Sequence, residues 1–295
     1  MLIILLVIIQ SYDCRVFKIY NSDFIPNGGN ILLKSIPEYS NRLVECLSEC
    51  ESSSLCLYTR MNESDCSLYS TINQFTTPMS PNVFIYKKIF ENNGLMHYWP
   101  IISSSVGEII GGKNLYDGVN VDFVPDRFGN ENSAIRFRDG FIKVPPLFIR
   151  DSFTFTSWFR ILNLTFNARI LEFGNGVDNN NIILVFCHDL NGKPFFSIVN
   201  QNEWNNVVIS NTVFQIGRWY HIAFGVGGNR TFLYIDSKFD IETIGPGMPK
   251  NINRTINYFG GTDWNNAFKA YLEMDEIKIY ERSLSESEIQ NEYLN

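Results

Sequence analysis

The stretch GRWYHIAFGVGGNRTFLYID, residues 217–236, contains two runs of apolar and aromatic residues separated by glycine and asparagine. Each run has the length and the β-branched and aromatic content of a β-strand. The segment GVGGN, residues 225–229, lies between the two runs and is typical of a hairpin turn. This stretch therefore predicts a pair of antiparallel strands.

Similar runs recur on both sides of this hairpin, divided by Gly, Asn, Asp and Pro. They are SAIRFRDGFIKV, SFTFTSWFRI, ARILEFG, NIILVFCHD, PFFSIV, NNVVIS, TINYFGG and AYLEMDEIKIY. Many short strands separated by turn residues are typical of a sandwich or jelly roll. The clearest helical segment is the tail SLSESEIQNEYL, where Ser285 and Glu288 form a capping box ahead of Ile289. We therefore expect a mainly β fold.

Several motifs occur in order across residues 91–295: HYWPI, SAIRFRDGFIKVP, DSFTFTSWFRI, GRWYHIAFGVGGNRTFLYID, YFGG and FKAYLEMDEIKIYERSLSESEIQNEY. Together they resemble the laminin-G-like, concanavalin A-like jelly roll that pentraxins and many secreted lectin-like modules share. The resemblance implies a large antiparallel β-sandwich. One departure is Asp236-Ser237, where relatives usually have an Asp-Gly turn.

The chain begins with an apolar run, Leu2 to Ile9, that is too short to span a bilayer as a helix. We interpret residues 1–11 as a secretory signal peptide, with Ser11 at the cleavage point. The alternative is a buried N-terminal strand. Asn-x-Ser/Thr acceptors for N-glycosylation agree with a secreted, extracellular protein and occur at Asn62, Asn163, Asn229 and Asn253. We expect no membrane span in the mature chain.

Four cysteines lie within VECLSECESSSLCLYTRMNESDC, residues 44–66. Cys46 and Cys50 share one face of a predicted helix, so each should bridge outward. The spacing favours nested disulfides, Cys50 to Cys56 and Cys46 to Cys66, over the crossed pairing. A zinc site is a further alternative, although the usual CxxC pairs are absent.

Residues 12–90 resemble the PAN/Apple domain: an extended segment, a helix with Cys-x3-Cys, and the strands LCLYTR and DCSLYS. The resemblance implies one helix on an antiparallel sheet, nested disulfides, and binding of proteins or carbohydrates. We place the linker around TTPMSPN and the boundary near residue 90. Cys14 and Cys187 are left over; they could bridge the domains, pair between chains or stay reduced.

Two motifs were weighed as catalytic sites. Glu273-Met274-Asp275 resembles part of the glucanase motif on this jelly roll, but Ile277 and Lys278 stand where the second glutamate should be. Retaining hydrolysis needs two carboxyl groups about 5 Å apart. The second motif, Cys187-His188-Asp189, lies along one strand, where neighbouring side chains point to opposite faces. We therefore expect no catalytic residues, with a glycoside hydrolase as the less favoured alternative.

Calcium is the cofactor that the jelly-roll resemblance implies. In such domains an aspartate of the closing strand, here Asp275, often binds the ion with carbonyl groups of the first loop. Asp117 and the carbonyls around Gly111 to Gly118 offer further oxygen ligands. The alternative is that Asp275 caps a turn or accepts backbone hydrogen bonds.

The net charge of −7 and the pI near 5.1 argue against a nucleic-acid partner, which needs a basic face. Trp204 and Trp264 lie in polar segments that we interpret as loops, where an aromatic ring can stack on a sugar. We therefore expect a secreted recognition or adhesion protein that binds glycans or extracellular proteins. The main alternative is a structural module that binds only proteins.

Overall fold

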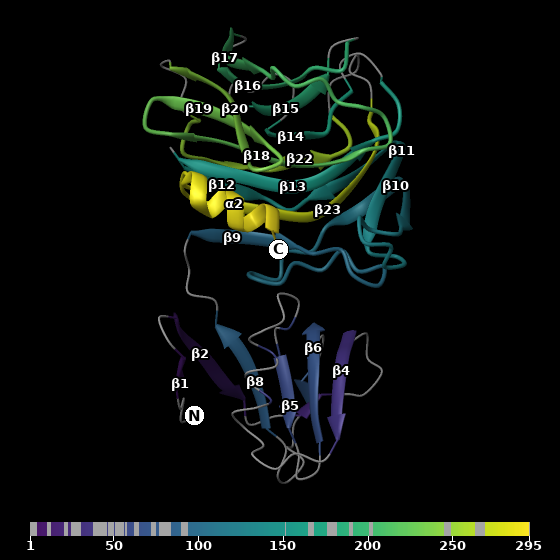
Figure 1. Ribbon diagram of the computed structural model, residues 1–295, viewed down its shortest axis with the longest axis vertical. Coiled ribbons are helices and arrows are strands. Elements are labelled where there is room, and N and C mark those ends of the chain that lie inside the picture. Colours follow the sequence, from purple (N-terminus) through teal and green to yellow (C-terminus); the bar gives the residue numbers. More distant parts are fainter. Residues whose placement is uncertain are drawn as a thin grey trace. The chain divides into compact units, whose positions relative to one another are not determined.

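The computed structural model divides into two compact units, Met1–Asn93 and Gly94–Asn295 (Figure 1). The first is described at residues 5–10, 13–20, 23–24, 31–37, 46, 50, 56, 58–61, 65–71, 75–76 and 84–89. The second is described at residues 94–150, 152–164, 168–175, 182–188, 191–200, 203–244, 249–262 and 269–294.

The first unit is built on a six-stranded sheet with the order β1-β2-β8-β5-β6-β4, and β3 and β7 form a separate pair. Its strands are β1 (Leu5–Gln10), β2 (Asp13–Tyr20), β3 (Asp23–Phe24), β4 (Ile31–Pro37), β5 (Tyr58–Met61), β6 (Asp65–Thr71), β7 (Phe75–Thr76) and β8 (Phe84–Ile89). All pairings in this sheet are antiparallel.

Two disulfides hold this unit together. Cys46 is bonded to Cys66, and Cys50 is bonded to Cys56, which is the nested arrangement that the spacing favours. Cys46 and Cys50 have helical backbone, and all four cysteines are buried. A domain this small buries little apolar surface, so covalent links are an expected source of its stability.

Of two expectations about this unit, one stays a prediction and the other is wrong. Leu5–Gln10 forms strand β1 and pairs with β2, as in the alternative interpretation of the apolar run, so the signal peptide stays a prediction. The segment TTPMSPN is not the linker, because the strand after it, β8, pairs with β2 and β5 inside the first sheet. The units divide between Asn93 and Gly94.

The second unit is a β-sandwich whose thirteen-stranded antiparallel sheet folds over on itself. Its strands are β9 (Leu95–Trp99), β10 (Tyr116–Val124), β11 (Ala134–Val144), β12 (Leu147–Ile149), β13 (Phe153–Ile161), β14 (Leu171–Gly174), β15 (Ile182–His188), β16 (Pro194–Asn200), β17 (Glu203–Ile209), β18 (Trp219–Gly227), β19 (Arg230–Ile235), β20 (Lys238–Ile244), β21 (Ile252–Arg254), β22 (Ile256–Phe259) and β23 (Tyr271–Tyr280), followed by helix α2 (Glu286–Leu294). The mainly β fold class is confirmed.

The core lies between the two layers. Phe155 and Phe159 of β13, Phe224 of β18, Phe196 of β16 and Phe259 of β22 are buried in one apolar cluster. Strand β11 joins the layers, since its first half pairs with β23 and its second half with β22. Alternate side chains of β11, β23, β13 and β18 point into this core, and the others point outward.

Strand β10 has an irregular backbone beside β11. Asp117 and Asn120 have positive φ, and the register of pairing shifts twice. A Cβ at Gly140 would lie 2.3 Å from the Val119 carbonyl oxygen, so only glycine permits this approach of the two strands. The irregular strand lines a pocket of about 550 Å³, bounded by Gly118, Asn120, Val121, Asp122 and Arg138.

Candidate functional site

One line of side chains crosses the outward face of the second unit. Asp122 of β10 lies opposite Arg136 of β11, which lies opposite Glu273 of β23. Glu273 in turn lies opposite Arg160 of β13, which lies opposite Trp219 of β18. We call these five residues the arginine row.

Glu273 lies at the middle of the arginine row and is bonded to both guanidinium groups. Arg136 Nε donates to Glu273 Oε1 at 2.8 Å, and Arg160 Nε donates to Oε2 at 2.5 Å. The Glu273 side chain is 0% exposed, whereas the arginines are 25% and 27% exposed. The row therefore presents positive charge to solvent and hides its central negative charge.

The row ends in an aromatic ring on one side and in a charged pair on the other. The guanidinium carbon of Arg160 lies 5.0 Å from the ring centroid of the half-buried Trp219. At the other end, Arg138 lies opposite Tyr271 and pairs through Nε with Asp122 Oδ2 at 2.6 Å. Because Arg138 and Asp122 also line the pocket beside β10, the row and this pocket are continuous.

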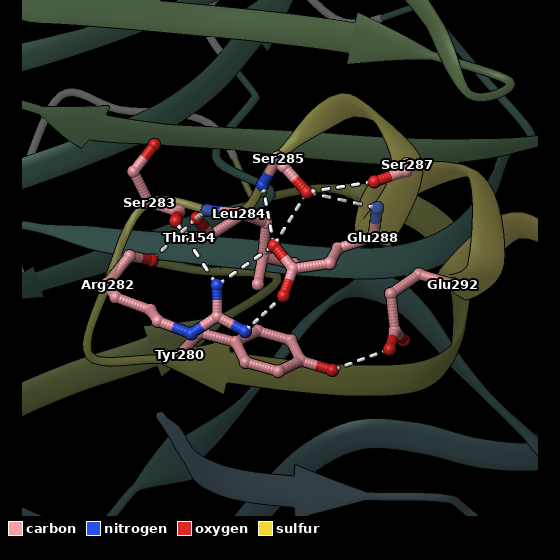
Figure 2. A network of polar contacts seen from close by, with 9 residues as sticks. All are labelled: Thr154, Tyr280, Arg282, Ser283, Leu284, Ser285, Ser287, Glu288 and Glu292. Atoms are coloured by element: carbon pink, nitrogen blue, oxygen red, sulfur yellow. Dashed lines mark hydrogen bonds and ion pairs between the residues drawn. The ribbon is translucent and has the colours of Figure 1, made fainter. Parts of the chain in front are cut away.

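Helix α2 covers the other half of the same face. In Figure 1 it lies against β13 and β23. Ile289 is buried in a small apolar cluster with Ala223, Phe232 and Tyr280. The carboxylate of Glu292 accepts a hydrogen bond from Tyr280 Oη at 2.6 Å (Figure 2). It also accepts one from Lys278 Nζ at 2.7 Å. These contacts leave the arginine row outside the covered area.

The first turn of α2 is fixed by its own polar contacts, shown in Figure 2. The predicted capping box is present: Ser285 N donates to Glu288 Oε2 at 2.8 Å, and Glu288 N donates to Ser285 Oγ at 3.4 Å. Arg282 also binds Glu288 with both Nη atoms. Thr154 Oγ1 donates to the Arg282 carbonyl and accepts from Leu284 N, so β13 holds the segment that leads into the helix.

The loop between β10 and β11 forms the border between the covered and open halves. Arg127 lies with its guanidinium carbon 4.6 Å from the Trp158 ring centroid and 4.2 Å from that of Phe128. Asp126 Oδ1 accepts from the backbone N–H groups of Phe128 and Asn130. Phe128 is 72% exposed on this loop. An exposed aromatic ring thus lies against Arg127 at this border.

Burial dominates the electrostatics of the border. Loss of hydration lowers the pKa of His221 to about 3, so this imidazole is neutral at physiological pH. Burial, with the nearby Glu276 carboxylate, raises the pKa of Asp275, and Arg127 opposes this rise. Arg127 Nη1 lies 3.2 Å from Asp275 Oδ2, and Glu276 N donates to Asp275 Oδ1 at 2.7 Å. The carboxylate of Asp275 is therefore already engaged by the protein.

The two residues that we expected to share calcium lie apart. Asp275 is the residue after Met274, which pairs with Ile135 near the start of β11. Asp117 binds Lys143 Nζ at 3.0 Å, near the end of β11. The structure therefore does not bring Asp117 and Asp275 into one site. Over the described parts of the chain, no three His, Cys, Asp or Glu side chains form a group that could hold a metal ion.

The first loop, expected to supply carbonyl ligands, is organised by a carboxylate. Glu108 is buried and accepts from the N–H groups of Tyr98, Ile110, Gly111 and Lys113. Burial alone would raise the pKa of Glu108, but a hydrogen bond with His97 and those from the backbone lower it. Glu108 belongs to no recognisable sequence motif, so only the structure reveals its role.

The residues of the two catalysis-like motifs are engaged in the fold or lie outside the described segments. Ile277, where a second glutamate would stand, is in the core, and Lys278 binds Glu292. Glu276, the residue after Asp275, has a left-handed backbone with φ 51°. Its carboxylate accepts a hydrogen bond from the Tyr98 hydroxyl. Cys187 and His188 are consecutive residues of β15, and Asp189 lies outside the described residues.

The two tryptophans and the glycosylation acceptors lie in different surroundings. Trp204 is in strand β17, paired with Val199, so its expected place in a loop is wrong; Trp264 lies outside the described residues. Asn163, Asn229 and Asn253 are exposed, and Asn62 lies outside the described residues. Cys14 is in β2.

Sequence reasoning found Glu273 but missed Arg136 and Arg160. The signal was present in the alternation of AIRFR and SWFR, in which each arginine occupies the outward position between core residues. The alternation does not reveal the register between strands. That register places both arginines opposite Glu273.

No helix within the described segments is long and apolar enough to cross a membrane. A comparison with curated protein sequences finds no match. No family model matches the PAN/Apple resemblance of residues 12–90, which stays a prediction.

Many solved structures resemble the chain, among them the following three. Domain 4 of AbnA, an extracellular GH43 arabinanase of Geobacillus stearothermophilus in complex with arabinotriose, is 17% identical, with a TM-score of 0.53 over 68% of this chain and 98% of that domain. A sialidase of Trypanosoma rangeli is 14% identical, with a TM-score of 0.53 over 85% of this chain and 38% of the sialidase. A structure concerning botulinum neurotoxin type C, whose cell entry depends on interaction with two ganglioside molecules, is 11% identical, with a TM-score of 0.50 over 69% of this chain and 51% of that one.

At these identities the likeness shows the fold, and the chain spans about half or less of the sialidase and toxin chains. The sequence itself matches one family model over residues 136–290, more than half of the chain. That model contains the strands of the arginine row from β11 onward and most of α2. The chain therefore belongs to the concanavalin A-like lectin/glucanase superfamily.

Proposed function

We propose that the chain is a secreted, non-enzymatic recognition protein whose jelly roll binds glycans. The observation that carries this proposal is the state of Glu273, the residue that resembles a glucanase carboxylate. It is fully buried and bonded to two arginines. A nucleophile or acid must reach the glycosidic bond, and hydrolysis needs a second carboxyl group nearby. The arginines and Trp219 beside it, in contrast, are accessible.

Exposed guanidinium groups next to aromatic rings suit recognition of sugars, because N–H donors bind sugar oxygens and rings stack against C–H faces. The resemblance to an arabinanase domain in complex with arabinotriose agrees with this function. The paired disulfides and the exposed glycosylation acceptors support secretion.

A second candidate function is binding of an extracellular protein. Phe239 and Ile244 of the edge strand β20 are 50% and 68% exposed, and Ile216 is 56% exposed. Exposed apolar side chains on an edge strand favour contact with another chain.

The experiment is a glycan array probed with the secreted full-length protein, once with calcium and once with EDTA, together with assays for hydrolysis of each bound glycan. Binding without turnover supports the proposal. Turnover of a bound glycan overturns the non-enzymatic assignment, and a blank array in both buffers favours the protein-binding candidate.

A further inference from the structure

We infer that the arginine row, together with the neighbouring Arg138, binds glycans that carry an anionic group, a carboxylate or a sulfate, on a terminal sugar. This inference rests on the proposed function and names its ligand class. The guanidinium groups of Arg136, Arg138 and Arg160 lie on one face of the sheet. Arg136 and Arg138 are two residues apart on β11, and Arg160 is on β13. They carry one positive charge more than the two carboxylates that they contact, Glu273 and Asp122.

Burial decides which of these charged groups a ligand can touch. Glu273 is 0% exposed, so the charges that a ligand meets are those of three arginines and Asp122. Glu273 accepts from the Nε and Nη2 atoms of Arg136. A guanidinium group has five N–H donors in a fixed fork, so donors on Nη1 and Nη2 remain for a second acceptor. Carboxylate and sulfate groups have oxygen pairs whose spacing matches this fork.

The arginines of the row are already ordered in the protein without a ligand. Glu273 fixes Arg136 and Arg160 from below, and Trp219 packs against Arg160. Arginines that are already held in place lose less conformational freedom on binding than free surface side chains do.

The surroundings of the row fit the rest of a sugar. Trp219 and Tyr271 flank the guanidinium groups and are partly exposed. The pocket beside β10 continues from Arg138, with the amide of Asn120 and the carboxylate of Asp122 available to hydroxyl groups. We therefore place the anionic group over Arg136 and Arg160 and a neighbouring sugar in the pocket.

The test compares matched ligands on the full-length protein by isothermal titration calorimetry. The ligands are lactose, sialyllactose, sulfated lactose and a glucuronate-terminated disaccharide. We expect at least about tenfold tighter binding of one or more anionic ligands than of lactose, as for charge-assisted hydrogen bonds. We also expect this preference to weaken as salt rises toward about 0.5 M, because partly exposed charges are screened. The carboxylate and sulfate arms identify the source of the anionic group.

Two variants assign the preference to the row. The double variant R136K/R160K keeps the positive charges that Glu273 needs but removes the forks, and should reduce the preference about tenfold while the melting temperature changes little. R138A should weaken binding of the anionic ligand as well. Its matched control is R230A, because Arg230 is 51% exposed and pairs with Glu242. Arg230 begins β19 and lies opposite Gly227, at the end of β18 away from Trp219.

The outcomes separate this inference from the proposed function. Equal binding of lactose and the anionic ligands, or an anionic preference that R136K/R160K and R138A leave intact, overturns the inference while glycan binding stands. No binding of any ligand here or on the array overturns both. An equal loss in R230A and R138A also overturns it, because the effect would then reflect net charge alone.

Discussion

The ring of Tyr293 in α2 lies over the indole of Trp158 in β13, with centroids 5.4 Å apart and planes inclined by 27°. This stack holds the last turn of the helix at the middle of the outward face, where the covered half ends. Arg127 packs against the same indole, so Trp158 joins the helix, the sheet and the loop between β10 and β11.

Replacing Tyr293 with alanine should release the end of α2. Loss of a packed aromatic pair costs about 0.5–1.5 kcal/mol beyond the lost burial. We expect faster hydrogen exchange at residues 286–294, with little change in the strands. Y293F keeps the ring and should behave as the wild type. If Y293A leaves exchange in the helix unchanged, the stack does not anchor it.

Glu273 should be needed for stability. The variant E273Q keeps the shape of the side chain but leaves two guanidinium groups without their shared charge. Hydrogen bonds to charged groups contribute about 1.5–3 kcal/mol, and we expect E273Q to lower the free energy of unfolding by this amount. The comparison is E242Q, which removes the partner of the exposed Arg230 and should change stability by less than about 1 kcal/mol. Chemical denaturation measures both, and equal effects would contradict the role of Glu273.

His221 should make the protein less stable in mild acid. Its pKa is about 3 in the folded chain because of burial, against an ordinary value near 6.5. Below pH 6.5 the unfolded chain binds a proton that the folded chain does not, so stability is lost as pH falls toward 3. This amounts to about 2 kcal/mol between pH 8 and pH 5.

The variant H221F removes this titration. Glu292, Lys278 and Arg127 act on His221 in the native protein and remain in the variant, so the difference isolates the imidazole. We expect the loss of unfolding free energy between pH 8 and pH 5 to be about 2 kcal/mol smaller in H221F. An identical pH profile in both proteins would show that His221 is protonated in the folded state.

Calcium binding at Asp275 can be tested by D275A. If the ion is bound there, the variant lowers the melting temperature more in calcium than in EDTA, because a ligand of the folded state stabilises it. If Asp275 acts through Arg127 and the Glu276 backbone, the loss is equal in both buffers. D117A serves as the comparison, since Asp117 is exposed and pairs with Lys143.

The two disulfides should contribute differently to the free energy of unfolding. The bond from Cys46 to Cys66 closes a separation of 20 residues, and that from Cys50 to Cys56 closes one of 6. Loop-closure entropy predicts that removing the first pair costs about 3 kcal/mol and the second about 2 kcal/mol. Hydrogen exchange of residues 1–93 in the full-length C46A/C66A and C50A/C56A variants measures the order, and a larger effect of the second pair would contradict it.

The strands of the second unit were predictable because each one alternates or is bounded by turn residues. RWYHIAFGVG and TFLYID form the hairpin β18–β19, with Gly228 and Asn229 at the turn. The next turn is Asp236-Ser237, and both residues have positive φ. The turn that is usually Asp-Gly therefore forms with serine, and the strand pairing overrides the local preference of that residue.

The site was only partly predictable. Glu273 stood out as a carboxylate in a recognisable motif, but its meaning changed once Arg136 and Arg160 were found on either side. Those contacts join residues more than a hundred positions apart in the chain, and sequence periodicity contains no information on them. The linker was misassigned to TTPMSPN because Pro and Ser are equally common in linkers and in loops within a domain.

Helix α2 sets how much of the outward face a large ligand can reach. It is attached through side chains such as Tyr293, Glu292 and Ile289, and it contributes no strand to the sheet. Substitutions in the helix can therefore widen or narrow the aperture while the guanidinium groups keep their positions. In the proposed site, ligand size and ligand charge would be set by different segments of the chain, so selection could adjust one without disturbing the other.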